Sequence, residues 1–139
     1  MEVTVTNTTR ERINVGLIKR AALATLTFKR SKGDVSVVVI GDQRMKTLNF
    51  RYRGRNTVTD VLSFTEVEAE IQEKHFLGEI FIDYQVIKRQ AKKFSPSLTY
   101  EWAFIVIHGV LHLLGYEDDT KAGAEKMEKL GQTIIKKVI

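Results

Sequence analysis

The chain has 139 residues, of which 43% are hydrophobic and 28% are charged, and its formal net charge is +5. This balance is typical of a globular protein and excludes a disordered or fibrous chain. Because there is no cysteine, disulfides, thiolate metal sites, iron–sulfur clusters and cysteine nucleophiles are also excluded. We expect one domain over residues 1–139, and the basic charge is compatible with a nucleic-acid partner.

The sequence carries no signal for a membrane. No apolar run approaches the roughly 18 residues that a membrane-spanning helix needs. The N-terminus has neither the basic nor the apolar region of a signal peptide. We therefore expect a cytoplasmic protein that makes no membrane contact, and the sequence leaves its oligomeric state open.

The first part of the chain is predicted to alternate strands with helices. Valine and threonine alternate over residues 3–6, a pattern typical of an edge strand. Apolar residues at helical spacing predict a helix over 12–28, and a turn over 31–34 ends it. A β-branched run predicts a buried strand over 35–40. Asp42 is expected to cap the helix that follows.

The middle of the chain is predicted to hold two short strands and an exposed connection. Residues 53–56 are expected to form a loop, and residues 60–64 a short strand. The acidic segment 66–74 is interpreted as an exposed hairpin arm or loop. A further strand is predicted over 77–82, followed by a helix over 83–94 that begins with a capping aspartate.

The last part of the chain is predicted to be helical. Ser97 or Thr99 is expected to cap a broadly apolar, central helix that runs to Leu114, and Gly115 is expected to end it. An amphipathic helix is predicted from Thr120 onward. Several helices with strands of mixed spacing predict an α+β fold, in which a small mixed sheet packs with helices.

The histidines give the strongest chemical signal. Of the three histidines in the chain, His108 and His112 lie four residues apart on the predicted central helix. This spacing puts both imidazoles on one helix face, where they can share a metal ion or simply pack on the helix flank. Asp118 reaches the same site only if the chain folds back, and Gly115 is placed to allow that. Three protein ligands and an open position are typical of a catalytic zinc site.

The residues around this pair restrict the chemistry. The spacing His-x3-His-x2-Gly-x2-ligand is that of the metzincin zinc proteases, in which a glutamate after the first histidine is the general base. This chain has Gly109 at that position. Because glycine accepts no proton, peptide hydrolysis by that mechanism is not expected. Glu117 and Asp119 flank Asp118 and compete with it for the role of third ligand.

The histidine stretch is one of three blocks that occur in a recognisable order. They are the sequence His-Gly-Val-Leu-His-Leu-Leu-Gly-Tyr-Glu-Asp over 108–118, the pair of segments 48–54 and 59–64, and the segment 77–80. In composition, order and separation these blocks resemble the YbeY family, the endoribonucleases of ribosomal RNA maturation.

The resemblance implies a metal-dependent, single-strand-specific endoribonuclease that acts in 16S rRNA 3′-end maturation and ribosome quality control. Its implied partners are single-stranded rRNA and the ribosome or small-subunit proteins. It also implies an α+β fold with a zincin-like metal site, in which His108 and His112 hold zinc and Arg53 is catalytic. Most members have a histidine where this chain has Asp118. A carboxylate is a legitimate zinc ligand, but it makes the metal a weaker Lewis acid.

Other polar residues near these blocks have two interpretations. Arg51 and Arg55 are expected to hold the flanking RNA backbone, although a solvated basic loop explains them as well. Ser63 and Thr59 either orient phosphate or serve as local capping hydroxyls. Asp60 is interpreted as a residue of a local turn.

Three further functions stay open at this point. One is a non-catalytic ribosome-assembly factor that binds rRNA and uses the metal as a structural clip. Another is a different zinc-dependent hydrolase, such as a peptidase or amidase, against which Gly109 argues. The last is a non-haem iron oxygenase, whose ligand set is also two histidines and a carboxylate.

Overall fold

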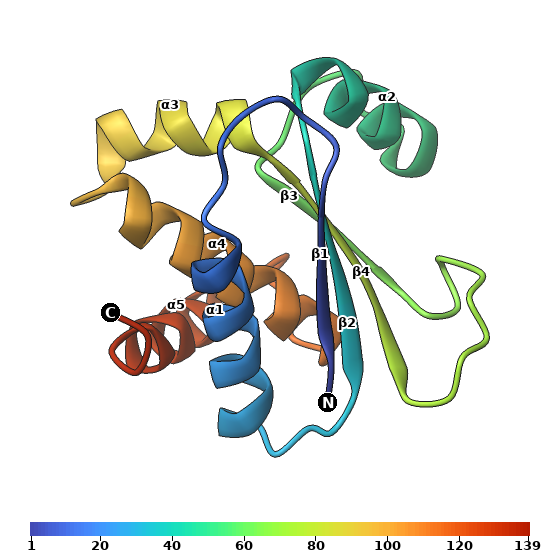
Figure 1. Ribbon diagram of the computed structural model, residues 1–139, viewed down its shortest axis with the longest axis vertical. Helices are drawn as coiled ribbons and strands as arrows, with labels where there is room; N and C mark the ends of the chain where they lie inside the picture. The colour runs from blue at the N-terminus through green and yellow to red at the C-terminus, as the bar shows by residue number, and fades with distance from the viewer.

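The computed structural model describes residues 1–139 and contains a four-stranded sheet with helices around it (Figure 1). This is the α+β arrangement predicted from the sequence. None of the helices is long and apolar enough to cross a membrane. In chain order the elements are β1 (Val3–Asn7), α1 (Val15–Phe28), β2 (Asp34–Ile40), α2 (Asp42–Arg53), β3 (Val61–Thr65), β4 (Phe76–Asp83), α3 (Tyr84–Phe94), α4 (Leu98–Leu113) and α5 (Lys121–Ile135).

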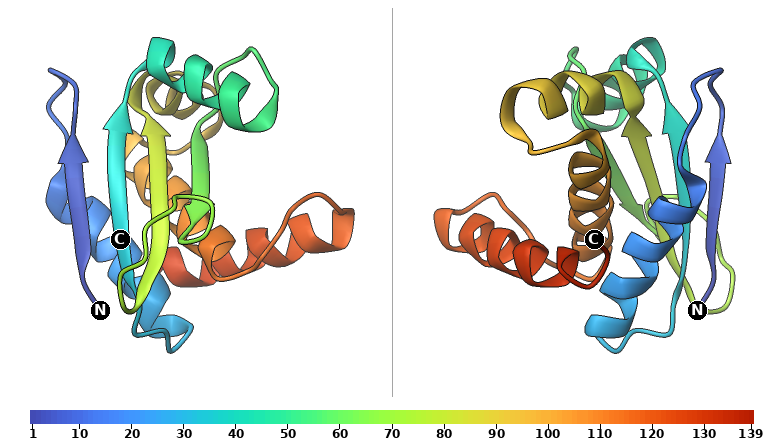
Figure 2. Two further views of the ribbon diagram at one scale, coloured as in Figure 1. Left: turned by 90° about the vertical axis from the view of Figure 1, so that its right-hand side faces the viewer. Right: turned by 60° about the vertical axis from the view of Figure 1, so that its left-hand side comes forward.

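The sheet is mixed, with the strand order β1-β2-β4-β3 (Figure 2, left). Strands β1, β2 and β4 are parallel, and β3 pairs antiparallel with β4. β1 therefore lies at one edge, as its alternating pattern predicted, and β3 lies at the other. The edge strand β3 packs beside α4, so residues of β3 and α4 can form one site.

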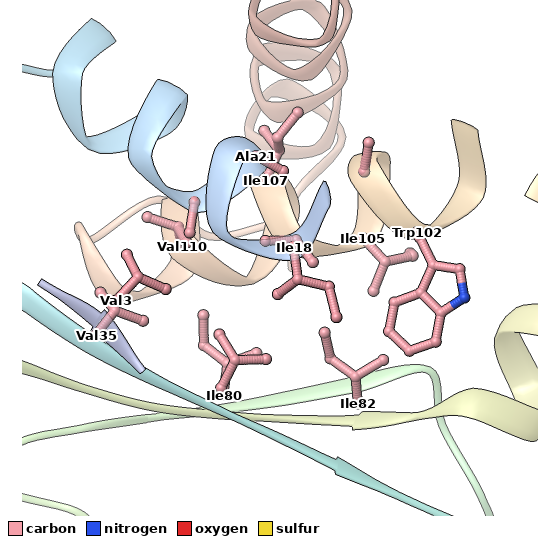
Figure 3. Packing of buried hydrophobic residues seen from close by; sticks show 14 of the residues in the cluster. Val3, Ile18, Ala21, Val35, Ile80, Ile82, Trp102, Ile105, Ile107 and Val110 are labelled. Carbon is pink, nitrogen blue, oxygen red and sulfur yellow. The ribbon is translucent and has the colours of Figure 1, made fainter. Parts of the chain in front are cut away.

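The two faces of the sheet bury cores of different size. Side chains alternate along β2, so that Val35, Val37 and Val39 join the larger cluster of 23 buried residues, whereas Ile40 joins a cluster of four. The larger cluster lies between the sheet and helices α1, α4 and α5, as Figure 3 shows for its central residues. The main core is thus built on α4, which fixes that helix firmly against the sheet.

Helix α4 is buried along nearly its whole length and open along a single stripe. Beyond its first two residues, the residues of α4 that are not buried are Tyr100, Phe104, His108 and His112, which are spaced by four residues. Residues four apart lie on the same side of a helix. The two candidate metal ligands therefore lie on the one face of this central helix that a ligand can approach.

Several predicted boundaries and caps are confirmed. Asp83 caps α3, Ser97 rather than Thr99 caps α4, and Thr120 caps α5, since each side chain accepts a hydrogen bond from a backbone N–H of the first turn. The acidic segment 66–74 forms the exposed connection between β3 and β4.

Three details of the prediction are wrong. Helix α1 begins at Val15, three residues later than predicted, because the Asn14 side chain accepts a hydrogen bond from its first turn. Gly41, not Asp42, occupies the N-cap position of α2, and the Asp42 carboxylate instead binds an arginine of α3. Arg53 is the last residue of α2 rather than part of the loop.

Candidate metal centre

The chain reverses sharply at the end of α4. Gly115 has a φ of 97°, which is in the left-handed region where only glycine is unstrained. The N–H of Gly115 donates to the His112 carbonyl at 3.0 Å, and the N–H of Tyr116 donates to the Leu111 carbonyl at 3.1 Å. This is the hydrogen-bond pattern of a Schellman motif. The reversal returns Asp118 to the open face of α4, as the sequence predicted.

Three side chains converge there, and we call them the His–Asp cluster: His108, His112 and Asp118. Their facing atoms are the two Nε2 atoms, 3.0 Å apart, and the Asp118 Oδ2, which lies 3.2 Å from the Nε2 of His108 and 3.7 Å from that of His112. In a tetrahedral zinc site with bonds of about 2.0–2.1 Å, ligand atoms lie about 3.3 Å apart. The three donors therefore have the spacing of one face of such a site.

The surroundings of the two histidines leave their Nε2 lone pairs free to bind a metal. The Nδ1 of His112 lies 3.0 Å from the Tyr116 carbonyl. Because a carbonyl only accepts, Nδ1 carries the proton and Nε2 presents its lone pair to a ligand. Burial, together with the charge of His112, lowers the pKa of His108, which favours the neutral imidazole that binds metal. The side chains of His108, His112 and Asp118 are 23%, 26% and 47% exposed, so the site is open to solvent.

Gly109 faces the sheet and not the His–Asp cluster. A Cβ atom at this position would lie 2.9 Å from the Ile80 Cγ2 and 3.2 Å from the Val61 Cγ2. The Ser63 hydroxyl donates to the Gly109 carbonyl at 3.0 Å, so Ser63 ties β3 to α4. The close packing explains the glycine, and it leaves no room for a general base next to the first histidine.

Arg53, the last residue of α2, already has partners within the protein. Its guanidinium donates to the Glu68 carboxylate and to the Ser63 carbonyl, each at 3.2 Å, and it stacks 5.0 Å over the Phe64 ring. Although burial acts to raise it, hydrogen bonds from Thr65 and Arg53 hold the pKa of Glu68 below its usual value. The sequence signalled Glu68 only as part of the acidic segment, and did not indicate its partner.

The other polar residues singled out in the sequence have contacts of their own. Arg51 and Arg55 are exposed and form no ion pair, and the Arg51 guanidinium lies 5.8 Å over the Tyr52 ring. Asp60 does more than form a turn, because its carboxylate accepts from Gln90 at 3.3 Å and its charge acts on the pKa of His108. The Thr59 hydroxyl lies 3.5 Å from the Asp60 carboxylate, a contact between two side chains and not the backbone bond of a capping hydroxyl.

Together these features define an α+β protein with a candidate mononuclear metal centre on its central helix. A family model described as Endoribonuclease YbeY matches residues 2–139. The chain therefore belongs to the YbeY family, as the three sequence blocks indicated.

Relatives with this name occur in several bacteria. An Endoribonuclease YbeY of Thermodesulfovibrio yellowstonii is 46% identical over 102 residues, which span 73% of this chain and 64% of that protein. One from Chelativorans is 35% identical over 125 residues, spanning 86% of this chain and 76% of the relative. A solution structure of a Thermotoga maritima protein matches with a TM-score of 0.62 at 25% identity, covering 95% of this chain and 88% of that one.

Proposed function

We propose that this protein is a metal-dependent endoribonuclease that cuts single-stranded RNA and acts in 16S rRNA 3′-end maturation and ribosome quality control. The family membership supports an RNA substrate, since the relatives carry the name endoribonuclease. The proposal includes a cytoplasmic location, a single domain over residues 1–139, and the ribosome or its small-subunit proteins as partners.

The observation that carries the proposal is the geometry of the His–Asp cluster. The donors are spaced as zinc ligands are, on a half-exposed surface that leaves a further coordination position free. In this proposal His108, His112 and Asp118 hold one divalent ion, taken to be zinc, in a zincin-like arrangement. When bound, such an ion supplies Lewis-acid stabilisation of the negative charge that develops on the phosphate.

The arginines of α2 and the loop after it have complementary roles in the proposed reaction. Arg53 releases Glu68 and donates to the phosphate oxygens, where its planar guanidinium matches the geometry of the developing charge. Arg51 and Arg55 hold the flanking RNA backbone, because both are exposed and unpaired. Since Gly109 supplies no base, the attacking water loses its proton to solvent or to a carboxylate outside that position.

A second candidate function is a non-catalytic assembly factor that binds rRNA and keeps the metal as a structural clip. The engagement of Arg53 with Glu68 favours it, because this contact occupies the arginine that catalysis requires. Both candidates bind RNA, so only an assay of RNA cleavage distinguishes them.

The test begins with metal content, measured by plasma mass spectrometry on tag-free wild type, His112→Ala, Asp118→Ala and Asp119→Ala. Near-stoichiometric zinc is expected in wild type and Asp119→Ala and should be lost in the other two variants. Asp119→Ala is the matched control because its carboxylate is adjacent in sequence but outside the cluster. Zinc retained in Asp118→Ala would reject Asp118 as a ligand.

The second step is cleavage of single-stranded and duplex RNA by the same proteins. Metal-dependent cleavage of the single strand, lost in His108→Ala that still folds, supports the nuclease. Stoichiometric metal and RNA binding without cleavage would favour the assembly factor instead.

A further inference from the structure

A groove opens beside α4, one helical turn before the His–Asp cluster. It has a volume of about 490 Å³, which is in the range of small-molecule sites, and it is bounded by α3, α4 and α5. These three helices follow one another around this side of the molecule (yellow, orange and red in Figure 2). Because none of the residues assigned to metal or phosphate lies in this groove, which we call the α4 groove, the proposed reaction does not account for it.

One wall of the α4 groove is an ordered set of hydrogen-bond acceptors. Glu101 is only 7% exposed, yet its carboxylate lines the groove, where it accepts from the Gln90 amide at 2.8 Å and from the Ser95 hydroxyl. The same Gln90 nitrogen donates to Asp60 at 3.3 Å. One amide thus holds two carboxylates side by side, and each carboxylate oxygen retains a lone pair.

Three aromatic side chains line the rest of the groove, together with Pro96, Ile105 and Glu128. Tyr100 and Phe104 stack with their rings 6.0 Å apart and 11° from parallel, and Phe94 stands at the rim with 81% of its surface exposed. Glu128 adds a third carboxylate, and no lysine or arginine lines the groove. These charges repel phosphate, so the groove suits a flat, neutral group with N–H donors on its edge.

The groove and the His–Asp cluster lie on the same stripe of α4. Phe104 is four residues before His108, a separation of about 6 Å along the helix axis. Asp60 lines the groove and directly precedes β3, the strand that packs beside α4. A group seated on the aromatic wall is therefore directly beside a strand bound at the cluster.

We propose that the α4 groove binds one unpaired nucleobase of the RNA, with guanine preferred, so that Asp60 and Glu101 select the base next to the cleaved bond. The inference rests on the proposed function for its substrate class. Guanine places N–H donors side by side on its Watson–Crick edge, which matches adjacent carboxylates, whereas uracil presents one N–H between two carbonyls. Aromatic side chains supply the stacking that single-stranded bases use on proteins.

The test measures binding without cleavage, with metal removed by a chelator. Fluorescence anisotropy compares a short oligouridine with the same strand containing one guanine. We expect the guanine strand to bind wild type about tenfold more tightly. Both Glu101→Gln and Phe94→Ala should reduce this ratio towards one, the first by replacing an acceptor oxygen of the carboxylate with an N–H donor and the second by removing an aromatic ring from the groove. Phe50→Ala is the matched control, because Phe50 is an exposed aromatic residue of α2 outside the groove.

The outcomes separate this inference from the nuclease proposal. Equal binding of the two strands by wild type, or a guanine preference that survives in both variants, overturns the base site even if the protein cleaves RNA. A preference that is lost in the variants supports the base site even if no cleavage is found. Phe94→Ala keeps the test decisive if Glu101→Gln fails to fold, since Phe94 is a surface residue.

Discussion

Two clusters of ionisable groups in the protein differ in whether the fold itself supplies a cation to them. The His–Asp cluster at the end of α4 is partly exposed. Its donor atoms face one another, and no lysine or arginine forms an ion pair with Asp118. The other cluster lies where β4 ends and α2 and α3 begin, and we call it the carboxyl pair: Asp42 and Asp83. Asp42 receives two hydrogen bonds from Arg89, at 3.0 and 2.9 Å, so its cation is built in.

Asp83, the other member of the carboxyl pair, is buried without a hydrogen-bonded cation, and its pKa shows the consequence. Asp83 is fully buried and caps α3 through one oxygen, while its other oxygen has no hydrogen-bond partner. Burial and the neighbouring Asp42 raise the pKa of Asp83 to about 7. The Arg89 guanidinium instead lowers the pKa of Asp42. A buried carboxyl group thus takes up a proton where the fold supplies no cation. An exposed set of donors does not need one, because water solvates it when no metal is bound.

The largest expected effect is the response of stability to metal. Zinc at a free concentration about a thousandfold above its Kd should raise the free energy of unfolding by about 4 kcal/mol, because only the folded chain brings the three ligands together. Thermal melting with zinc and with a chelator measures this shift. The shift should vanish in His108→Ala and persist in Asp83→Asn, which alters only the carboxyl pair. An equal zinc shift in His108→Ala would contradict the assigned site.

The carboxyl pair should instead respond to pH. The pKa of Asp83 is about 7 in the folded state against a usual value of 3.8, so the folded state holds a proton that the unfolded chain releases between these values. The contribution of Asp83 to stability is therefore greatest below about pH 4 and is lost as pH rises through about 7, with a total loss of roughly 2 to 4 kcal/mol.

Asp83→Asn isolates this effect, because asparagine resembles the protonated acid and still caps a helix. The lowered pKa of His108 acts with the opposite sign, since it costs stability as pH falls below about 6.5. Urea unfolding across this pH range, in the presence of a chelator, gives the free energy of unfolding of wild type and of Asp83→Asn. Because His108 contributes equally to both proteins, its contribution cancels in the difference. A difference that does not change with pH would show that Asp83 is ionised throughout.

Close packing under the His–Asp cluster should have a smaller effect. Gly109→Ala places a methyl group 2.9 Å from Ile80 and is expected to cost about 1 to 3 kcal/mol of stability and to weaken zinc binding, because α4 must move off the sheet. Gly16→Ala on α1 is the matched control, since that site is exposed and alanine favours a helix. Urea unfolding of both variants measures the costs, and equal stabilities would rule out the packing argument.

The smallest expected effect concerns the ion pair between Arg53 and Glu68. Glu68→Gln frees Arg53 and should tighten binding of single-stranded RNA about twofold to fivefold, because exposed ion pairs are worth only about 0.2 to 1 kcal/mol. Glu66→Gln removes the same charge from the same connection without touching Arg53, so it controls for the change in overall charge. Weaker binding in Glu68→Gln would mean that Glu68 positions Arg53 instead of competing with RNA for it.

Local sequence determined much of the fold. Alternation placed β1 at an edge, β-branched residues marked β2, and Asp83, Ser97 and Thr120 cap the helices that they were predicted to cap. These features depend on residues within one turn or one strand of each other, so the pattern carries the information. The start of α1 was misplaced because apolar spacing continues into the residues before its Asn14 cap.

The residues of the candidate metal centre could also be predicted from the sequence, because they too are set by local features of the chain. The four-residue spacing of His108 and His112 and the chain reversal at Gly115 are local properties, and together they bring Asp118 to the histidines. That the cluster holds zinc stays a prediction, as do the roles of Arg51, Arg53 and Arg55.

Only the tertiary structure decided which distant groups meet. The pairing of Arg53 with Glu68, the bridge from Gln90 to Asp60 and Glu101, and the burial of Asp83 beside Asp42 each join separate elements. Such contacts depend on how β3, α3 and α4 pack, and no periodicity records them. The sequence by itself therefore determined the helices, the strands and a local ligand set, because these depend on neighbours along the chain. The packing of α4 against the sheet decided which of its faces stays open, and hence where a substrate can bind.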